Sequence, residues 1–523
     1  MKKLVLLFAA CLLVLPLSAQ SDDVVIVATN ISDLQSLDIA SNGSSTNLSV
    51  FYTVYERLYE LPPDPSQPLI PNLATGHTVS EDGFTWTFKL REGVTFASGN
   101  PLTANDVVFS WKRVQNFQNE PAQVFNLFVG DVVAVDDLTV EVRLSNAVFP
   151  LPIPFFDVLT ALPSFSILDS QLVIANGGSL DPSQDTATEW LNQNSAGSGP
   201  FILTGWTPEV ELTMVRNDNY WAGNPPAIAG VTLRQANDST TALQLVERGD
   251  VDIAQNLDKD LADAIEASPN LNLEIGQSLA IVYLALSPSN PESPLSDVRV
   301  RQAVMLSIDY DGIIDGLLGG LAVRPGGVVP IGILGGAASE AVRYERNVEA
   351  ARALLAEAGF ADGVTINLNM STLPLGGVTP DVLAAKLTAD LAEAGITLNV
   401  QIDPPSVYLT GRNAGQYDAF LGNFSADFFD PTNWTVLYGV ADFQNIARYI
   451  RLADPAIAEA AFATLFAPPA MREMAVVGFN AAITEQALYS VLYQPQVVDA
   501  VSASLQGYVF HPIQKVRYQE LSR

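Results

Sequence analysis

Two aspartates stand three positions apart in the stretch NFSADFFDPTNW, residues 423–434 of this 523-residue chain. Paired carboxylates can serve as a general acid and base in a glycosidase, bind a cation, or fill turn and cap positions. Pro-Thr-Asn-Trp follows Asp430 and predicts a helix N-cap with Pro at the first helical position. For Asp427, the roles of ligand-binding carboxylate and of solvated loop acid both stay open.

Other chemistry is scarce along the chain. His77 and His511 are the only histidines, and neither has a serine or acid at a spacing typical of a catalytic triad. The single cysteine, Cys11, lies in the N-terminal apolar run, so no thiolate chemistry is expected after export. We find no metal-ligand spacing and expect no metal and no cofactor. The 57 acidic residues supply many pairs, so a secreted carboxylate-pair hydrolase stays an alternative.

Helices and strands alternate upstream of the aspartates and should position them. Asn347 caps a predicted helix, VTINLNM alternates apolar and polar residues, and a second helix is expected over 381–394. ITLNVQI and YDAFLGN follow as strands, which indicates an α/β unit with a largely parallel sheet. Ligands of such sheets bind beyond the carboxyl ends of the strands, and the aspartate stretch begins there.

Two further units are predicted nearer the N-terminus. DGFTWTFKL predicts a half-buried strand over 84–90, and Thr103 with Asp106 predicts the capping box of the next helix. Residues 231–255 read as strand, helix and strand, with a connection short enough for a parallel crossover.

The N-terminus has the pattern of an export signal. Lys2 and Lys3 precede an apolar run, and we expect cleavage after Ala19. A lipoprotein reading would instead make Cys11 the first mature residue. After removal of residues 1–19 the chain keeps 24 basic and 57 acidic residues, a net charge of −33. Such a surface disfavours binding to nucleic acid and anionic lipid. The signal pattern itself predicts an exported protein, periplasmic or extracellular.

Six blocks in order resemble one known family, the extracytoplasmic solute-binding proteins, family 5, of ABC importers. These blocks are VYERLYEL, SEDGFTWTFKLREGVTFASGNPLTANDVVFSWKRV, GSGPFILTGW with RNDNYWAG and LQLVERGDVDIA, DVRVRQAVMLSIDYDGIIDGLLGG, EAARALLAEAGFADG, and LYQPQVVDAVSASLQGYV. Their order over nearly the whole mature chain makes the resemblance specific.

The resemblance implies an α/β fold of the type II periplasmic-binding-protein kind, with two α/β lobes, a hinge and an extra inserted domain. The implied segments are a signal peptide at 1–19, domain I at 20–50, 186–278 and 488–523, domain II at 51–185, and domain III at 279–487. It also implies a receptor, not an enzyme, that captures a small solute in the cleft between domains I and III. The solute is expected to be a di- or oligopeptide, delivered by a monomer to an ABC permease in the membrane, with no role for nucleic acid. A sugar or a metal chelate as ligand stays an alternative.

The resemblance also implies site residues. Peptide-binding members often carry Trp-x-x-Asp, whose Asp receives the peptide amine, and this chain matches it as Phe424, Ser425, Ala426 and Asp427. Asp427 would therefore bind an ammonium group, with Phe424 in place of the Trp and Ser425 beside it. An arginine that some members place just upstream is absent. Three further candidates for the cleft are Ser32, Tyr283 and Trp434, the last two with a core role as the alternative.

Overall fold

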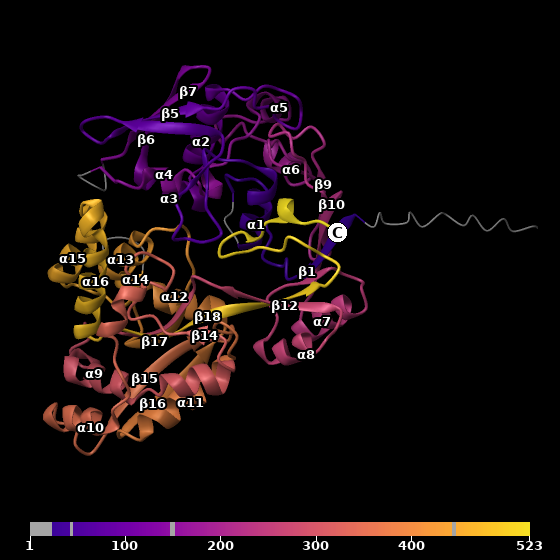
Figure 1. Ribbon diagram of the computed structural model, residues 1–523. Helices are drawn as coiled ribbons and strands as arrows, with labels where there is room; N and C mark the ends of the chain where they lie inside the picture. Colours follow the sequence, from indigo (N-terminus) through magenta and orange to yellow (C-terminus); the bar gives the residue numbers. More distant parts are fainter. Residues whose placement is uncertain (1–22, 42–44, 147–151, 442–445) are drawn as a thin grey trace, which may run out of the picture.

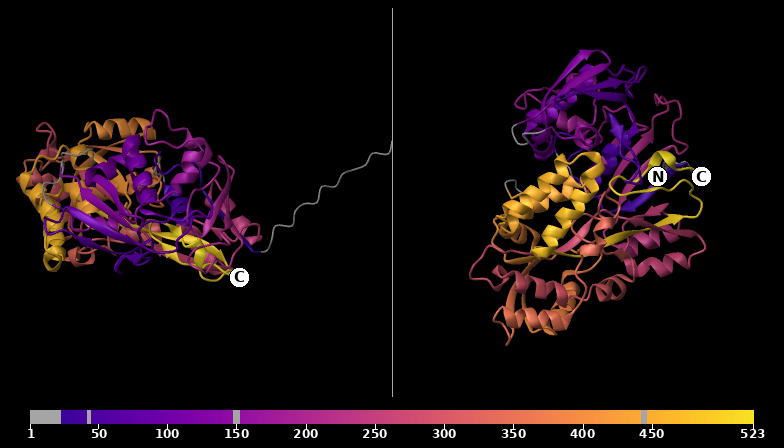
Figure 2. Two further views of the ribbon diagram at one scale, coloured as in Figure 1. Left: turned by 90° about the horizontal axis from the view of Figure 1, so that it is seen from above. Right: turned by 60° about the vertical axis from the view of Figure 1, so that its left-hand side comes forward.

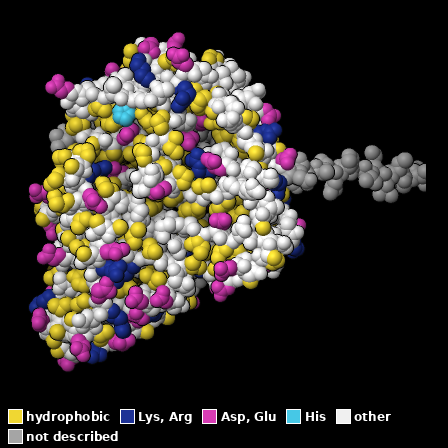
Figure 3. Space-filling model, viewed as in Figure 1, with side chains coloured by type: hydrophobic (Ala, Val, Ile, Leu, Met, Phe, Trp, Pro, Cys, Tyr) yellow, Lys and Arg dark blue, Asp and Glu magenta, His cyan; other side chains and the backbone are white. Residues whose placement is uncertain are grey.

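The computed structural model describes residues 23–41, 45–146, 152–441 and 446–523. The predicted signal peptide, with Cys11 and Ala19, lies outside these residues. Within them, no helix has both the length and the apolar character that a bilayer crossing requires. Acidic side chains are scattered over the face shown in Figure 3, among fewer basic ones.

A twelve-stranded sheet runs through two lobes. One long strand, β18 (Tyr489–Ser502), belongs to both lobes and joins them. The first half of β18 pairs with β13 (Ile281–Leu286), and its second half pairs with β12 (Leu271–Gln277). Figure 1 shows β18 passing between the two groups of helices. We call the β12 side lobe I and the β13 side lobe III. Because one strand belongs to both, the lobes are coupled through its backbone.

Lobe I contains parallel strands covered by two helices. β1 lies between β10 and β11 and is parallel to both, so the helix between β10 and β11 makes the predicted crossover. Asp238 caps that helix by accepting a hydrogen bond from the Thr241 amide. The elements are β1 (Val24–Thr29), β8 (Phe201–Thr207), β9 (Glu211–Arg216), β10 (Gly230–Gln235), β11 (Ile253–Ala254), α7 (Ser239–Glu247) and α8 (Ala262–Glu266).

Lobe III is the α/β unit expected from the sequence. The predicted strands are β15, β16 and β17, and β15 is parallel to both of the others. The alternation in β15 buries Val364, Ile366, Leu368 and Met370 against flanking helices. The elements are β14 (Ala322–Val323), β15 (Val364–Ser371), β16 (Ile396–Asp403), β17 (Ala419–Phe424), α9 (Val298–Ser307), α10 (Val348–Glu357), α11 (Pro380–Ala392), α12 (Pro405–Asn413), α13 (Thr432–Gly439), α14 (Ile446–Tyr449), α15 (Pro455–Phe466) and α16 (Pro469–Glu485).

A separate four-stranded antiparallel sheet lies above lobe III in Figure 1, with the lobe III helices α13, α15 and α16 between it and strands β15 to β17. Figure 2 shows the same order from another side. The predicted strand over 84–90 and the capping box of Thr103 and Asp106 are both confirmed here. The elements are β4 (Ala74–Val79), β5 (Thr85–Leu90), β6 (Val129–Asp136), β7 (Thr139–Leu144), α2 (Ala104–Phe117), α3 (Glu120–Phe128), α4 (Phe156–Leu159), α5 (Ser170–Ala175) and α6 (Ala187–Leu191). We call this part the inserted unit. One further helix, α1 (Ser45–Val54), lies beside the inserted unit. Two short strand pairs stand apart from the larger sheets: β2 (Tyr59–Glu60) with β3 (Ile70–Pro71), and β19 (Phe510–His511) with β20 (Lys515–Val516).

Candidate functional site

Asp427 lies in the loop between β17 and α13, directly beyond the carboxyl end of β17. Its side chain is exposed, while Asn433 on the first turn of α13 is buried. The Asp427 amide donates to Asn433 Oδ1 at 2.8 Å, and Asn433 Nδ2 donates to Asp427 Oδ2 at 3.2 Å. Asn433 therefore fixes both the backbone and the carboxylate of Asp427, which leaves this acid oriented at the surface.

Asp430 has a different environment three residues later. Its Oδ1 accepts from the amide and the hydroxyl of Thr432, at 3.0 and 2.6 Å, at the start of α13. Pro431 already has helical dihedral angles. These contacts match the predicted role of Asp430 as a helix cap, although the helix begins at Thr432, one residue later than predicted. Arg472 on α16 also donates to both carboxylate oxygens at 2.6 Å, and this pair is largely buried, with side-chain exposures of 13% for Arg472 and 4% for Asp430. Because both oxygens of Asp430 are occupied, the two aspartates are not arranged as an acid and base pair.

Loss of the Arg472 side chain should destabilise the protein. We expect Arg472→Met to lower the free energy of unfolding by about 3 kcal/mol, since it leaves the Asp430 carboxylate buried without its counter-ion. Urea unfolding followed by circular dichroism measures this. Arg248→Met is the control, because both side chains of the Arg248–Asp250 pair are exposed, and it should cost less than about 1 kcal/mol. Equal losses in the two variants would contradict the assigned role of Arg472.

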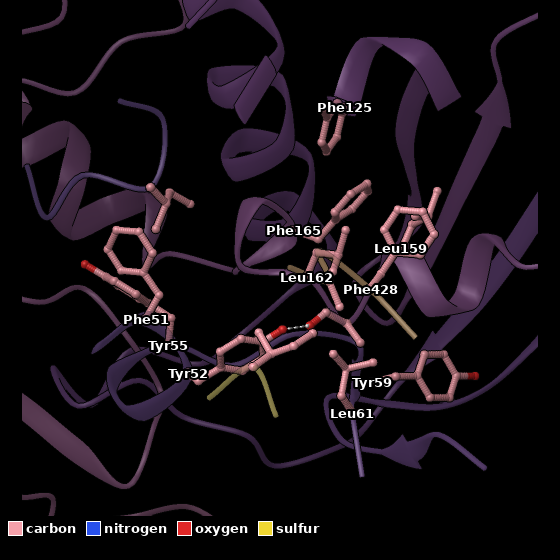
Figure 4. Close-up of a cluster of buried hydrophobic side chains, with 14 of the residues drawn as sticks. Phe51, Tyr52, Tyr55, Tyr59, Leu61, Phe125, Leu159, Leu162, Phe165 and Phe428 are labelled. Carbon is pink, nitrogen blue, oxygen red and sulfur yellow. Dashed lines mark hydrogen bonds between the residues drawn. The ribbon is translucent and has the colours of Figure 1, made fainter. Parts of the chain in front are cut away.

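The aromatic residues of the β17–α13 loop join lobe III to the other parts of the molecule. Phe428 stacks on Phe155 of the inserted unit, with ring centroids 6.0 Å apart, and Phe429 stacks on His511 at 5.7 Å. Figure 4 shows Phe428 among buried side chains of the inserted unit, near Leu159. The loop that carries Asp427 is therefore packed against two other parts of the chain, at the junction between them.

A cavity of about 750 Å³ opens beside this loop. Its size lies within the range of small-molecule sites, and its lining is mostly apolar, with the charged side chains of Asp157, Asp430, Arg472 and Glu473 among it. Burial raises the pKa of Asp157 in its wall, with His77 opposing the effect. Both the inserted unit and lobe III contribute, so we call it the junction cavity; its lining includes Tyr59, Phe155, Asp157, Phe429, Asp430 and Arg472.

His511 is held in its neutral form by its hydrogen bonds. Nδ1 accepts from the amides of Ile513 and Gln514, at 3.2 and 3.0 Å, so the ring proton lies on Nε2, 3.2 Å from the Leu61 carbonyl. Burial lowers the pKa of His511 from 6.5 to about 4. His511 thus caps a turn from a buried position.

We expect His511 to make the protein less stable in acid. The unfolded chain takes up a proton near pH 6.5 and the folded chain near pH 4, so this stabilisation is complete above pH 6.5 and is lost as the pH falls toward 4. Between pH 7.5 and 5 the loss should be about 2 kcal/mol. Asn at this position offers an acceptor in place of Nδ1 but does not titrate. His511→Asn should therefore show a loss smaller by that amount in urea unfolding; identical pH dependence in both proteins would contradict the assignment.

The six residues predicted for a site fall into three places. Phe424, Ser425 and Asp427 lie together at the end of β17, with the Phe424 ring against Trp434 at 6.0 Å. Trp434 is fully buried, and Tyr283 is 1% exposed among Phe420, Tyr438 and Tyr489, so the structure favours the core alternative for both. Ser32 is exposed and lines a second cavity, in lobe I.

Sequence reasoning missed two residues that shape this region, Asn433 and Arg472. The sequence placed Asn433 in the first turn of the predicted helix, but nothing in it indicated a contact with Asp427. His77 is bonded through Nδ1 to the Tyr59 hydroxyl at 2.8 Å, so both histidines have structural partners. No cluster of three or more potential metal ligands occurs among the residues that the structure describes. The β17–α13 loop offers the oriented carboxylate of Asp427, and the junction cavity beside it has aromatic side chains in its wall. Both features suit binding of a cationic or amine-bearing solute.

Comparison with known proteins gives a consistent picture. A model of the family "Bacterial extracellular solute-binding proteins, family 5 Middle" matches residues 68–443. The probable D,D-dipeptide-binding periplasmic protein DdpA of Escherichia coli is 28% identical over 491 residues, which cover 92% of this chain and 90% of that protein. Heme-binding protein A of Haemophilus influenzae is 27% identical over 436 residues, 78% of this chain and 75% of that protein. A solved structure of the Helicobacter pylori periplasmic binding protein DppA, in complex with the peptide STSA, aligns with a TM-score of 0.76 and 20% identity, covering 95% of this chain and 97% of that one. The likeness confirms the predicted two-lobed α/β fold class.

Proposed function

This chain belongs to the bacterial extracellular solute-binding proteins, family 5, and we propose that it captures a di- or oligopeptide. The family consists of solute-binding receptors, so the ligand is expected to leave the protein chemically unchanged. One observation carries the proposal: Asp427, an exposed carboxylate fixed by Asn433, stands at the carboxyl end of β17 where three parts of the chain meet.

The chemistry of a peptide N-terminus suits this position. An ammonium group that donates to an oriented carboxylate makes a charge-assisted hydrogen bond, which is stronger than a neutral one. Phe424 is half-buried next to Asp427 and offers an apolar surface to a ligand side chain. A ligand enclosed by the two lobes would be shielded from water, which would strengthen the hydrogen bond between its ammonium group and Asp427.

The wider role follows from family membership and remains part of the proposal. We place domain I at 20–50, 186–278 and 488–523, domain II at 51–185, and domain III at 279–487, with closure of I on III around β18. Export and cleavage after Ala19 would put a monomer outside the cytoplasm, where it would deliver the peptide to an ABC permease. The names of the relatives support the periplasm and a peptide; one of them is a heme-binding protein, so the ligand class needs a direct test.

Thermal unfolding with candidate ligands separates these classes. A ligand that binds only the folded protein at about 100 times its dissociation constant stabilises it by about 2.7 kcal/mol. We expect short peptides with a free amine to raise the melting temperature by several degrees, and sugars, heme and metal chelates to leave it unchanged. A shift with sugar, heme or chelate alone would keep the fold and overturn the peptide assignment.

A further inference from the structure

A second cavity, of about 410 Å³, lies at the carboxyl ends of the parallel strands of lobe I. In sheets of this kind ligands bind at that edge, where β10 and β11 lie on opposite sides of β1. Its wall is mostly polar, and six of its side chains matter here: Ser32, Asp33, Asp238, Ser239, Gln255 and Lys515. We call it the lobe I cavity. Its position and volume suit part of a small solute.

Lys515 is the one basic side chain in this lining. It is half-buried, and within the described chain its ammonium has no hydrogen bond and no ion pair within 4 Å. Burial lowers the pKa of Lys515, while the charges of Asp499 and Asp33 act in the opposite direction. Its backbone has a left-handed φ of 75°, which is uncommon for a residue other than glycine. A partly desolvated ammonium gains more from a bound anion than a fully solvated one does.

Gln255 supplies a second unused donor in the same wall. It is 8% exposed, and its Nε2 is buried without a hydrogen-bond partner among the described residues. Buried amide donors are nearly always satisfied, so an unpaired one calls for an explanation. Asp238 is engaged by the Thr241 amide and hydroxyl, at 2.8 Å each, as the cap of α7. Asp33 and Asp238 both add negative charge to the wall and repel an anion. A ligand group with a single negative charge is therefore favoured over a dianion.

The lobe I cavity adjoins the loop of Asp427 through two contacts. Lys515 pairs with His511 across the β19–β20 hairpin, and the His511 ring stacks on Phe429, two residues after Asp427. These contacts form a continuous path from Lys515 to the Asp427 loop, along which a peptide held by its amine at Asp427 could extend.

We propose that the lobe I cavity receives the peptide's C-terminal carboxylate, with Lys515 as counter-ion and the Gln255 amide as second donor. The proposal rests on the peptide-binding function proposed above and makes Lys515 a residue that selects free acids over amides. The proposal predicts short peptide ligands with both termini free, since the amine would contact lobe III at Asp427 and the carboxylate would contact the lobe I cavity at Lys515.

Calorimetric titration with one peptide sequence, as free acid and as C-terminal amide, tests this. We expect amidation to weaken binding to the wild type about tenfold or more, the effect of losing one charge-assisted contact. Lys515→Gln should bind the free acid as weakly as the wild type binds the amide, and should bind the amide as the wild type does. Lys515→Arg should keep the preference, and Lys112→Gln, at a surface lysine paired with Asp131, should behave as the wild type.

Two results would overturn the assignment of Lys515. One is equal affinity of the wild type for acid and amide, which needs no variant to fold. The other is an equal loss for both peptides in Lys515→Gln, which would indicate structural damage instead of a lost contact. If no peptide of either form binds, the proposed function fails and this proposal fails with it; if both bind equally, peptide capture stands and only the carboxylate subsite is lost.

Discussion

Asp427→Asn is expected to weaken binding of a free-amine peptide about 10- to 100-fold, or about 1.4 to 2.8 kcal/mol. The amide keeps an oxygen that can accept from Asn433 Nδ2, so the loop geometry should persist while the negative charge is lost. Removing the charge converts a charge-assisted hydrogen bond into a neutral one, and the ammonium then loses its counter-ion inside the closed protein. Titration calorimetry of the wild type and the variant measures the difference.

An N-acetylated copy of the same peptide completes the comparison. Acetylation removes the ammonium, so it should weaken binding to the wild type by a similar factor and have little further effect on Asp427→Asn. Asp218→Asn, at an exposed acid, should bind both peptides as the wild type does. Equal affinity of the wild type for free and acetylated peptides would exclude Asp427 as the ammonium receptor.

Arg113→Met is expected to cause the largest loss of stability, about 3 to 5 kcal/mol, because it leaves two carboxylates buried without their counter-ion. Arg113 on α2 donates to both oxygens of Asp38, at 2.6 and 2.7 Å, and to both oxygens of Asp185, at 2.8 and 3.0 Å. All three side chains have at most 1% exposure. Asp38 also accepts from the Thr188 hydroxyl at 2.7 Å, so the segment after β1 is tied to the inserted unit through this cluster.

Chemical unfolding at neutral pH measures this loss, with Arg248→Met as the control. The Arg248–Asp250 pair is exposed on both sides, and its removal should change the free energy of unfolding by less than about 1 kcal/mol. The triple variant Asp38→Asn, Arg113→Met, Asp185→Asn should recover part of the loss, since it leaves no buried charge unpaired. A single variant as stable as the wild type would show that the cluster contributes nothing to the docking of the inserted unit.

The regular elements near Asp427 could be predicted because local signals agree with the packing. In β15 the strict alternation matches burial on one face, and Asn347 caps α10 by accepting from the Ala350 amide. The parallel crossover around α7 followed from its short connections. In each case the signal lies within one short stretch of the sequence, so it can be recognised without knowledge of long-range contacts.

The site itself depends on contacts between distant segments, which a single sequence does not reveal. Arg472 meets Asp430 across 42 positions, and Phe429 meets His511 across 82. Tyr283 and Trp434 were equally compatible with a core and a cleft, and their burial favours the core. Lys515 belongs to no sequence motif, and only its position in the wall of the lobe I cavity, as the one basic side chain of that lining, distinguishes it. Asp427 was identified through the family resemblance, whereas Asn433, which orients it, was not.

The most direct test of peptide capture is calorimetric titration with an unmodified short peptide, followed by mass spectrometry of the recovered ligand. We expect saturable binding of one peptide per protein molecule, and a recovered ligand of unchanged mass after prolonged incubation. Shorter peptide fragments in the recovered material, or no heat of binding with any peptide that has a free amine, would contradict the account.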